Sequence, residues 1–162
     1  MERDLRETPL YREVESFVRR VLEPGFGRFA DVSDPRPSPD GRWIAFRGDV
    51  LERLEGRPVG RIGLVATDGT AERHITFGPN DDDQPRWSPD GRTLTFRSDR
   101  AAEGKHQLYT LGLDAIGEAR PLPEVDGIAE LHAWSPDGSR LLVVVAGLEA
   151  EQSDAVGSGV VG

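Results

Sequence analysis

A motif centred on the turn Ser-Pro-Asp-Gly occurs three times in this chain and constrains its fold more than any other feature. The copies run over residues 35–47, 85–97 and 132–144 and align without gaps. The turn serines are 50 residues apart (38 to 88) and then 47 apart (88 to 135). A regular spacing of this size indicates a repeat architecture. The repeated turn residues are Ser38, Pro39, Asp40 and Gly41; Ser88, Pro89, Asp90 and Gly91; and Ser135, Pro136, Asp137 and Gly138.

Each of these turns is suited to join two antiparallel strands. Proline fixes one backbone angle, and the aspartate can accept hydrogen bonds from nearby N–H groups. Glycine tolerates the left-handed conformation that closes a short hairpin with a bulge. The strand after the first turn alternates, with Trp43, Ala45 and Arg47 on one face and Ile44 and Phe46 on the other. In the second copy, Leu94 and Phe96 occupy the apolar face.

Two more strands follow in each of the first two repeats. They are predicted at 61–66 and 71–76 around a turn at 67–70, and at 107–113 and 118–122 around a turn at 114–117. Residues 48–60 form a longer insertion in the first repeat. A period near fifty with four short strands per unit is typical of β-propeller blades. The fold class predicted is all-β: a partial β-propeller of about two and a half four-stranded antiparallel blades.

One amphipathic helix precedes the blades. Apolar residues recur at helical spacing, Thr8 can cap the helix, Pro9 suits its first position, and Pro24-Gly25 ends the run. The apolar residues are Leu10, Val14, Phe17, Val18, Val21 and Leu22.

The repeats divide the chain into five expected segments. These are an N-terminal helix and linker (1–30), blade 1 (31–80), blade 2 (81–127), the start of blade 3 (128–147) and a Gly/Val-rich tail (148–162). Closed propellers need at least four blades, so we expect the chain to be incomplete as a propeller.

Composition excludes several classes of function. The net charge of −9 argues against nucleic-acid binding, and the absence of cysteine excludes disulfides and cysteine-ligated zinc. The longest apolar stretch, Leu141 to Ala146, is too short to cross a membrane. The charged N-terminus lacks the apolar core of an export signal, so a cytoplasmic location is expected.

No catalytic, cofactor-binding or metal-binding residue is predicted. A serine hydrolase needs a nucleophile on a strained turn, a histidine and a carboxylate. The chain has no Gly-x-Ser-x-Gly sequence, and Gly157-Ser158-Gly159 lies in the low-complexity tail. The three histidines, at 74, 106 and 132, have no metal-ligand spacing. For His132 we expect a packed or hydrogen-bonded strand residue.

Other candidate binding residues have a structural interpretation that is favoured over a functional one. Asp81-Asp82-Asp83 could collect Ca²⁺, but consecutive residues do not normally converge on one ion, so a solvated loop between blades is favoured. Trp87 and Trp134 suit the core between sheets better than a ligand platform. Arg47 and Arg97 could line a central channel or lie at the rim.

The run Trp-Ser-Pro-Asp-Gly-Arg-x-Leu-x-Phe-x-Ser-Asp-Arg at 87–100 resembles the repeat of TolB-like propellers and of the N-terminal propellers of prolyl oligopeptidase-family serine peptidases. The helix before the first blade resembles the N-terminal segment of that peptidase family, which packs beside the hydrolase domain. The segment 78–87 (GPNDDDQPRW) resembles the acylaminoacyl-peptidase-like branch of the family.

The resemblance implies a non-catalytic propeller portion that gates peptide access to a C-terminal α/β-hydrolase domain, which would carry the catalytic Ser, Asp and His. The implied partners are further blades, that domain and peptides. The alternative is a non-enzymatic TolB-like propeller that binds a protein. Exposed strand edges and the apolar helix face predict self-association of the isolated chain.

Overall fold

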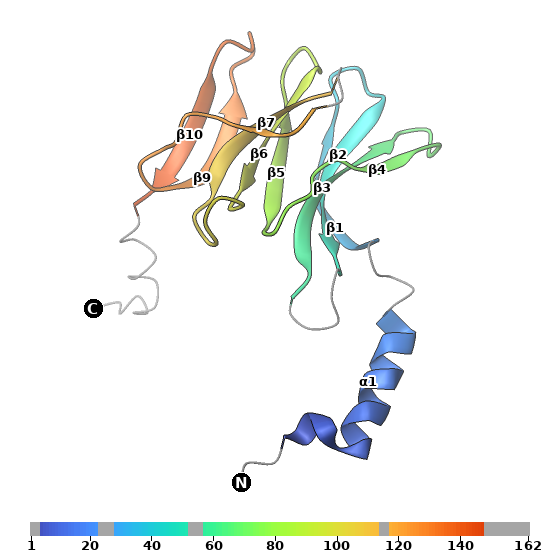
Figure 1. The fold of residues 1–162 in the computed structure, drawn as a ribbon. Coiled ribbons are helices and arrows are strands. Elements are labelled where there is room, and N and C mark those ends of the chain that lie inside the picture. Colours follow the sequence, from blue (N-terminus) through green and yellow to red (C-terminus); the bar gives the residue numbers. More distant parts are fainter. Residues whose placement is uncertain (1–3, 23–27, 52–56, 114–116, 148–162) are drawn as a thin grey trace, which may run out of the picture.

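The computed structural model describes residues 4–22, 28–51, 57–113 and 117–147. Within these residues, three antiparallel sheets lie side by side, and one α-helix, which follows a short 3₁₀ helix (Leu5–Glu7), stands apart from them (Figure 1). The first sheet has the order β1 (Phe29–Pro37), β2 (Trp43–Val50), β3 (Val59–Ala66), β4 (Glu72–His74). The second has the order β5 (Asp82–Trp87), β6 (Thr93–Ser98), β7 (Gln107–Gly112), β8 (Arg120–Pro121). The third pairs β9 (Ile128–Trp134) with β10 (Leu141–Ala146).

The three Ser-Pro-Asp-Gly turns have one hydrogen-bond pattern. In the first turn, Ser38 Oγ donates to Asp40 Oδ1 (2.6 Å) and accepts from the backbone N–H of Trp43 (3.0 Å). Asp40 also accepts from the backbone N–H of Arg42 (3.0 Å). The glycines have φ of +70° (Gly41), +72° (Gly91) and +71° (Gly138), which confirms the predicted left-handed conformation.

The hydrogen bonds of these turns hold the aspartates in their ionised form. The Ser135 hydroxyl and the backbone N–H of Ser139 lower the pKa of Asp137 to about 2. The corresponding serines lower the pKa of Asp40 and Asp90 as well. At neutral pH the ionised carboxylates therefore accept these hydrogen bonds.

The outer strands are shorter than predicted, and the loop in the first repeat is shorter too. The β3–β4 ladder ends where the Thr76 hydroxyl, in place of a backbone carbonyl, accepts from the N–H of Ile62 (2.9 Å). The expected insertion at 48–60 is wrong at both ends, because β2 continues to Val50 and β3 already begins at Val59. Most of the expected turn at 114–117 lies outside the described residues.

The hydrophobic core lies between the first two sheets, and it confirms the predicted alternation. Leu94 of β6 packs against Ala45 and Leu64 of the first sheet. Phe96 packs against Ile62 of the first sheet and Tyr109 of its own. The first sheet therefore buries its Ala45 face in this joint, and the second sheet buries its Leu94 face.

The helix α1 (Pro9–Leu22) begins as predicted. Thr8 Oγ1 accepts from the backbone N–H of Tyr11 (3.2 Å), and Pro9 is the first helical residue. Its apolar side chains face solvent: Leu10 is 70% exposed, Val14 52% and Phe17 58%. The expected stop at Pro24-Gly25 lies outside the described residues.

Candidate functional site

The first strand of each sheet, namely β1, β5 and β9, runs beside the first strand of the next sheet. Both β1 and β5 carry a bulge at matching positions, where Asp34 (φ 49°) and Gln84 (φ 50°) adopt a left-handed conformation. These residues connect neighbouring sheets. Asp34 Oδ2 accepts from Arg86 Nη1 (2.7 Å), and Gln84 Nε2 donates to the carbonyl of Glu130 (2.9 Å).

The acidic segment Asp81-Asp82-Asp83 is not the solvated loop that we expected. Asp82 is 1% exposed and accepts from Arg100 Nη2 (2.8 Å). Each carboxylate has a different arginine partner, because Asp81 pairs with Arg57 (2.9 Å) and Asp83 with Arg97 (2.7 Å). The interpretation was wrong because each partner comes from another part of the chain. The carboxylates diverge, and among the described residues no group of three metal-ligating side chains occurs.

Arg97 lies in the joint between the second and third sheets. Its guanidinium donates to both carboxylate oxygens of Asp83 (2.7 Å each). It also donates to the backbone carbonyls of Ala129 (2.9 Å) and Glu130 (2.8 Å) on β9. Arg47 occupies the matching position in the first sheet and pairs with Asp49 (2.8 Å). Arg97 therefore joins two sheets.

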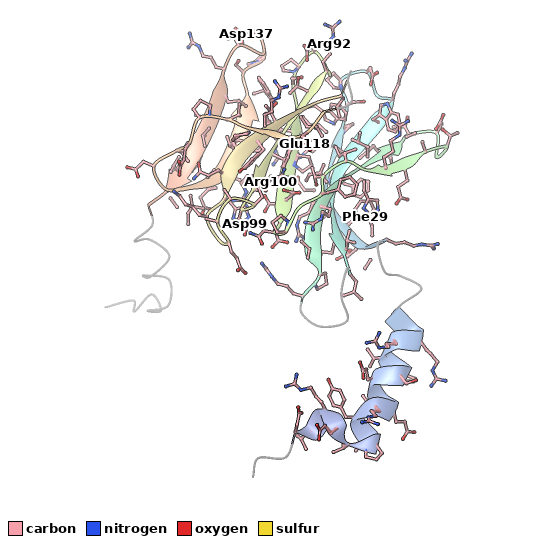
Figure 2. The ribbon with its side chains drawn as sticks, in the orientation of Figure 1. Phe29, Arg92, Asp99, Arg100, Glu118 and Asp137 are labelled. Atoms are coloured by element: carbon pink, nitrogen blue, oxygen red, sulfur yellow. The ribbon has the colours of Figure 1, made fainter. Side chains whose placement is uncertain are left out.

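Two buried or half-buried arginines were missed by reasoning from the sequence. Arg61 is 2% exposed and donates to the carbonyls of Gly78 and Asn80 (2.5 Å each), which attaches the connecting segment to β3. Arg100 lies over the Tyr109 ring (4.7 Å). The sequence feature that could have indicated a buried Arg61 is that it is the single charged residue, near the start, of an otherwise apolar strand. Figure 2 shows Arg100 and Asp99 far from the turns that carry Arg92 and Asp137.

The three histidines have three unrelated environments. His74 stacks on Phe29 (3.9 Å between ring centres), and His106 Nε2 lies 3.9 Å from Asp83 Oδ2. His132 is 5% exposed, and its Nε2 lies 3.1 Å from Thr95 Oγ1. The prediction of a packed, hydrogen-bonded strand histidine at 132 is confirmed. Ser158 lies outside the described residues.

The Thr95–His132 pair does not have the properties of a nucleophile and its base. Burial, together with the nearby positive charges of Arg86 and Arg97, lowers the pKa of His132 to about 4. Thr95 is 0% exposed, so no substrate can reach its hydroxyl. Within the part of the chain that the structure describes, the buried Nδ1 of His132 has no hydrogen-bond partner, whereas a catalytic histidine is oriented by a carboxylate there. The pair stabilises the joint between sheets.

Trp87 and Trp134, expected in the core between sheets, are half-buried at the joints. Trp87 Nε1 donates to the carbonyl of Arg36 on the preceding sheet (2.9 Å). Trp134 Nε1 donates to Thr95 Oγ1 on its preceding sheet (3.1 Å). Both side chains also line a shallow trough of about 400 Å³ that crosses the three turns; its other lining residues include Arg36, Pro39, Arg86 and Pro89.

A second cleft, of about 480 Å³, opens between the first two sheets. Trp43, Leu64 and Leu111 line it, and the Arg73 guanidinium lies 5.3 Å from the Trp43 ring centre at its edge. Both hollows offer aromatic and apolar surface with arginine at the margin. Surfaces of this kind suit apolar and aromatic groups. The serines that line the two hollows, Ser38, Ser88 and Ser135, donate their hydroxyl hydrogens to the turn aspartates Asp40, Asp90 and Asp137.

Solved structures share this arrangement of sheets. A TolB-type protein from Agrobacterium tumefaciens matches with a TM-score of 0.59 and 24% identity, over 71% of this chain and 39% of its own. The β-propeller domain of the Trilobed protease from Pyrococcus furiosus matches with a TM-score of 0.56 and 24% identity, over 73% of this chain and 35% of its own. The three sheets are blades of a β-propeller.

The acylaminoacyl peptidase from Pyrococcus horikoshii is also similar, with a TM-score of 0.56 and 23% identity, over 72% of this chain and 17% of its own. Both groups that the sequence resembles thus occur among the neighbours of this partial propeller. The chain spans well under half the length of each of these three proteins. No protein-family model and no curated protein sequence matches it. Among the described residues, no helix is long and apolar enough to cross a membrane.

Proposed function

We propose that this chain is the propeller portion of a cytoplasmic serine peptidase of the prolyl oligopeptidase family, in the acylaminoacyl-peptidase-like branch. Its role is to gate the access of peptides to an α/β-hydrolase domain that carries the catalytic residues. The observation that carries this proposal is the apolar face of α1, which remains exposed beside a propeller fold shared with two peptidases. An exposed apolar face of this kind favours a protein partner.

Gating requires that neighbouring blades do not separate easily. Arg97 and Gln84 link the second blade to the third through backbone carbonyls, and the Arg86–Asp34 ion pair links it to the first. Charge-assisted hydrogen bonds of this kind are stronger than neutral ones. A peptide would therefore pass around or through the propeller, and folded proteins would be excluded by size.

The coding sequence that surrounds these 162 codons tests this proposal. A downstream Gly-x-Ser-x-Gly elbow followed by Asp and then His supports the peptidase. A protein that ends after further blades, without this triad, contradicts it. A complementary test places a photo-crosslinking residue at Phe17 in the host cell, with Arg12 as the control position. Adducts that contain the hydrolase elbow support the proposal.

The alternative function is a non-enzymatic, TolB-like module that binds a protein. The trough across the three turns favours it, because half-buried tryptophan side chains line it together with proline and arginine side chains. The two functions differ in the surface that they use. If Arg86→Ala abolishes partner binding and Phe17→Ala retains it, the binding module is favoured. If Phe17→Ala abolishes binding and Arg86→Ala retains it, the peptidase is favoured.

A further inference from the structure

The cleft between the first two blades has the dimensions of a ligand-binding site. Its volume of about 480 Å³ lies within the range of sites for small ligands, about 300–1,000 Å³. Its walls come from both blades, with Leu64 on β3 and Leu111 on β7, and both leucines are buried. The half-buried rings of Trp43 and Trp87 also line it. The cleft therefore suits an aromatic or branched apolar group.

Arg73 provides a positive charge at the edge of this cleft. It lies on β4, and its guanidinium carbon lies 5.3 Å from the centre of the Trp43 ring. The attraction between the cation and the ring favours a guanidinium that stays over the ring face. Within the described part of the chain, Arg73 forms no ion pair with a carboxylate. Its charge is therefore available to an anionic group from outside the chain.

The indole of Trp43 is a second donor without an acceptor. The other two tryptophans, Trp87 and Trp134, donate from Nε1 to a carbonyl and to a hydroxyl of the preceding blade. Trp43 Nε1 has no acceptor among the residues that the structure describes. The N–H of a tryptophan usually has a partner when the ring is buried. One bound acceptor beside Arg73 would supply a partner to both donors.

The second blade repeats this arginine but not the ring beneath it. The register of the strands places Arg120 of β8 at the position that Arg73 has on β4. Fifty residues after Trp43, the second blade has Thr93. The contact between an arginine and an aromatic ring is therefore not part of the repeated architecture. It serves neither the hairpin turn nor the strand pairing that both blades share.

We propose that this cleft binds a carboxylate that carries an aromatic or branched apolar group, as the C-terminal residue of a peptide or an N-acylated amino acid does. The Arg73 guanidinium and the Trp43 indole N–H bind the carboxylate, and the apolar group lies against Leu64 and Leu111. A planar guanidinium suits this acceptor because it can donate two parallel hydrogen bonds to the two carboxylate oxygens.

Asp40 also lines the cleft, and its negative charge opposes the binding of an anion. Its Oδ1 already accepts from the Ser38 hydroxyl and from the backbone N–H of Arg42. Its Oδ2 lies 3.9 Å from Nε of the same arginine, which compensates part of the charge. The remaining repulsion grows with the charge of the ligand, so the cleft favours a carboxylate with one charge over a phosphate with two.

Isothermal titration calorimetry of the full 162-residue chain tests the site with three probes: N-acetylphenylalanine, its carboxamide and N-acetylglycine. The first should bind at least about tenfold more tightly than the others, since the carboxamide lacks the charge and N-acetylglycine lacks the ring. In Arg73→Gln the preference for the carboxylate should disappear. Arg120→Gln, at the equivalent position of the second blade, is the matched control and should bind like the wild type. Both arginines are exposed, so both variants should fold, and circular dichroism checks this.

The indole N–H signals in a nuclear magnetic resonance spectrum locate the ligand. The signal of Trp43, assigned by its absence in Trp43→Phe, should shift when N-acetylphenylalanine is added. The signal of Trp134 should stay in place, because this residue lies at the joint between the second and third blades and already donates to Thr95. A shift of Trp134 without a shift of Trp43 would place the ligand elsewhere and overturn the proposal.

A short peptide that ends in phenylalanine distinguishes the two sources of the ligand. Tighter binding than that of N-acetylphenylalanine identifies a peptide end, and equal or weaker binding identifies the N-acylated residue; both results support the site. Equal affinity for the carboxamide or for N-acetylglycine, unchanged binding by Arg73→Gln, or no binding of any probe overturns it.

The variant Ile116→Ser excludes one competing occupant. Residues 114–116 lie outside the described residues and connect two residues of the lining, Leu113 and Gly117. Binding of N-acetylphenylalanine that appears only in this variant would assign the cleft to a side chain of the protein itself, and would also overturn the proposal. These results decide the role of the cleft whether or not a hydrolase domain accompanies the blades.

Discussion

At the residue scale, Gly91 sits in the left-handed region with φ of +72°, in a turn that packs on the preceding blade. We expect Gly91→Val to destabilise the chain by about 1–2 kcal/mol, because a β-branched residue is strained at positive φ. Gly91→Asn should cost less, since asparagine tolerates this conformation. Chemical unfolding measures both.

The control for this prediction is Gly78→Val. Gly78 lies in a loop with open space around it and no positive φ, so its replacement should change stability little. Equal losses for the variants at 78 and 91 would contradict the role assigned to the turn.

Because of His132, we expect the free energy of unfolding to fall as the solution becomes acidic. Its pKa is about 4 in the fold and near 6.5 when unfolded, so below pH 6.5 the unfolded chain takes up a proton that the folded chain does not. This single residue therefore lowers the free energy of unfolding by up to about 3 kcal/mol between pH 6.5 and pH 4, and has no effect above that window.

Urea unfolding midpoints from pH 7.5 to pH 4 measure this dependence. His132→Gln should be less stable at pH 7 but should show a flatter pH profile. His74→Gln is the matched control and should keep the slope of the wild type. A wild-type profile that stays flat from pH 6.5 to pH 4.5 would show that His132 is hydrated in solution.

At the scale of elements, the ion pair of Asp82 with Arg100 connects the start of β5 to the loop that follows β6. Asp82 is 1% exposed, and the guanidinium lies over Phe96 and Tyr109. We expect Asp82→Asn to destabilise the chain by about 2–3 kcal/mol, because removal of one partner leaves a largely buried charge uncompensated.

The matched control is Glu124→Gln, which breaks the exposed pair between Lys105 and Glu124. Exposed pairs contribute about 0–1 kcal/mol, so the melting temperature should barely change. A similarly small effect for Asp82→Asn would mean that water reaches the Arg100 guanidinium once its carboxylate partner is gone.

The sequence predicted the elements that depend on local chemistry. Residue types at short spacing were enough to predict three features: the turn at Ser38 to Gly41, the faces of β2 and β6, and the start of α1. The partners of Asp81, Asp82 and Asp83 could not be predicted, because they come from loops and strands that only the packed fold brings together. The same holds for Arg61, whose acceptors are the carbonyls of a connecting segment.

At the scale of the whole molecule, the chain should have no peptidase activity. Among the described residues, the hydroxyl that lies 3.1 Å from His132 is that of Thr95, and it is inaccessible. We expect no turnover of aminoacyl or peptidyl chromogenic substrates by the purified chain. Turnover that survives Ser158→Ala would reveal an overlooked site, and turnover lost with that change would place the nucleophile in the tail.

The helix should contribute little to the stability of the blades. Leu10, Val14 and Phe17 are more than half exposed, and α1 stands away from the sheets (Figure 1). A helix of 14 residues is marginal in water without a packing partner. The free energy of unfolding of a chain that starts at Arg28 should therefore lie within about 0.5 kcal/mol of that of the full chain, because no buried apolar area is lost from the sheets. A loss of several kcal/mol would show that α1 packs against the blades in solution, and its apolar face would then be unavailable to the hydrolase domain proposed as its partner.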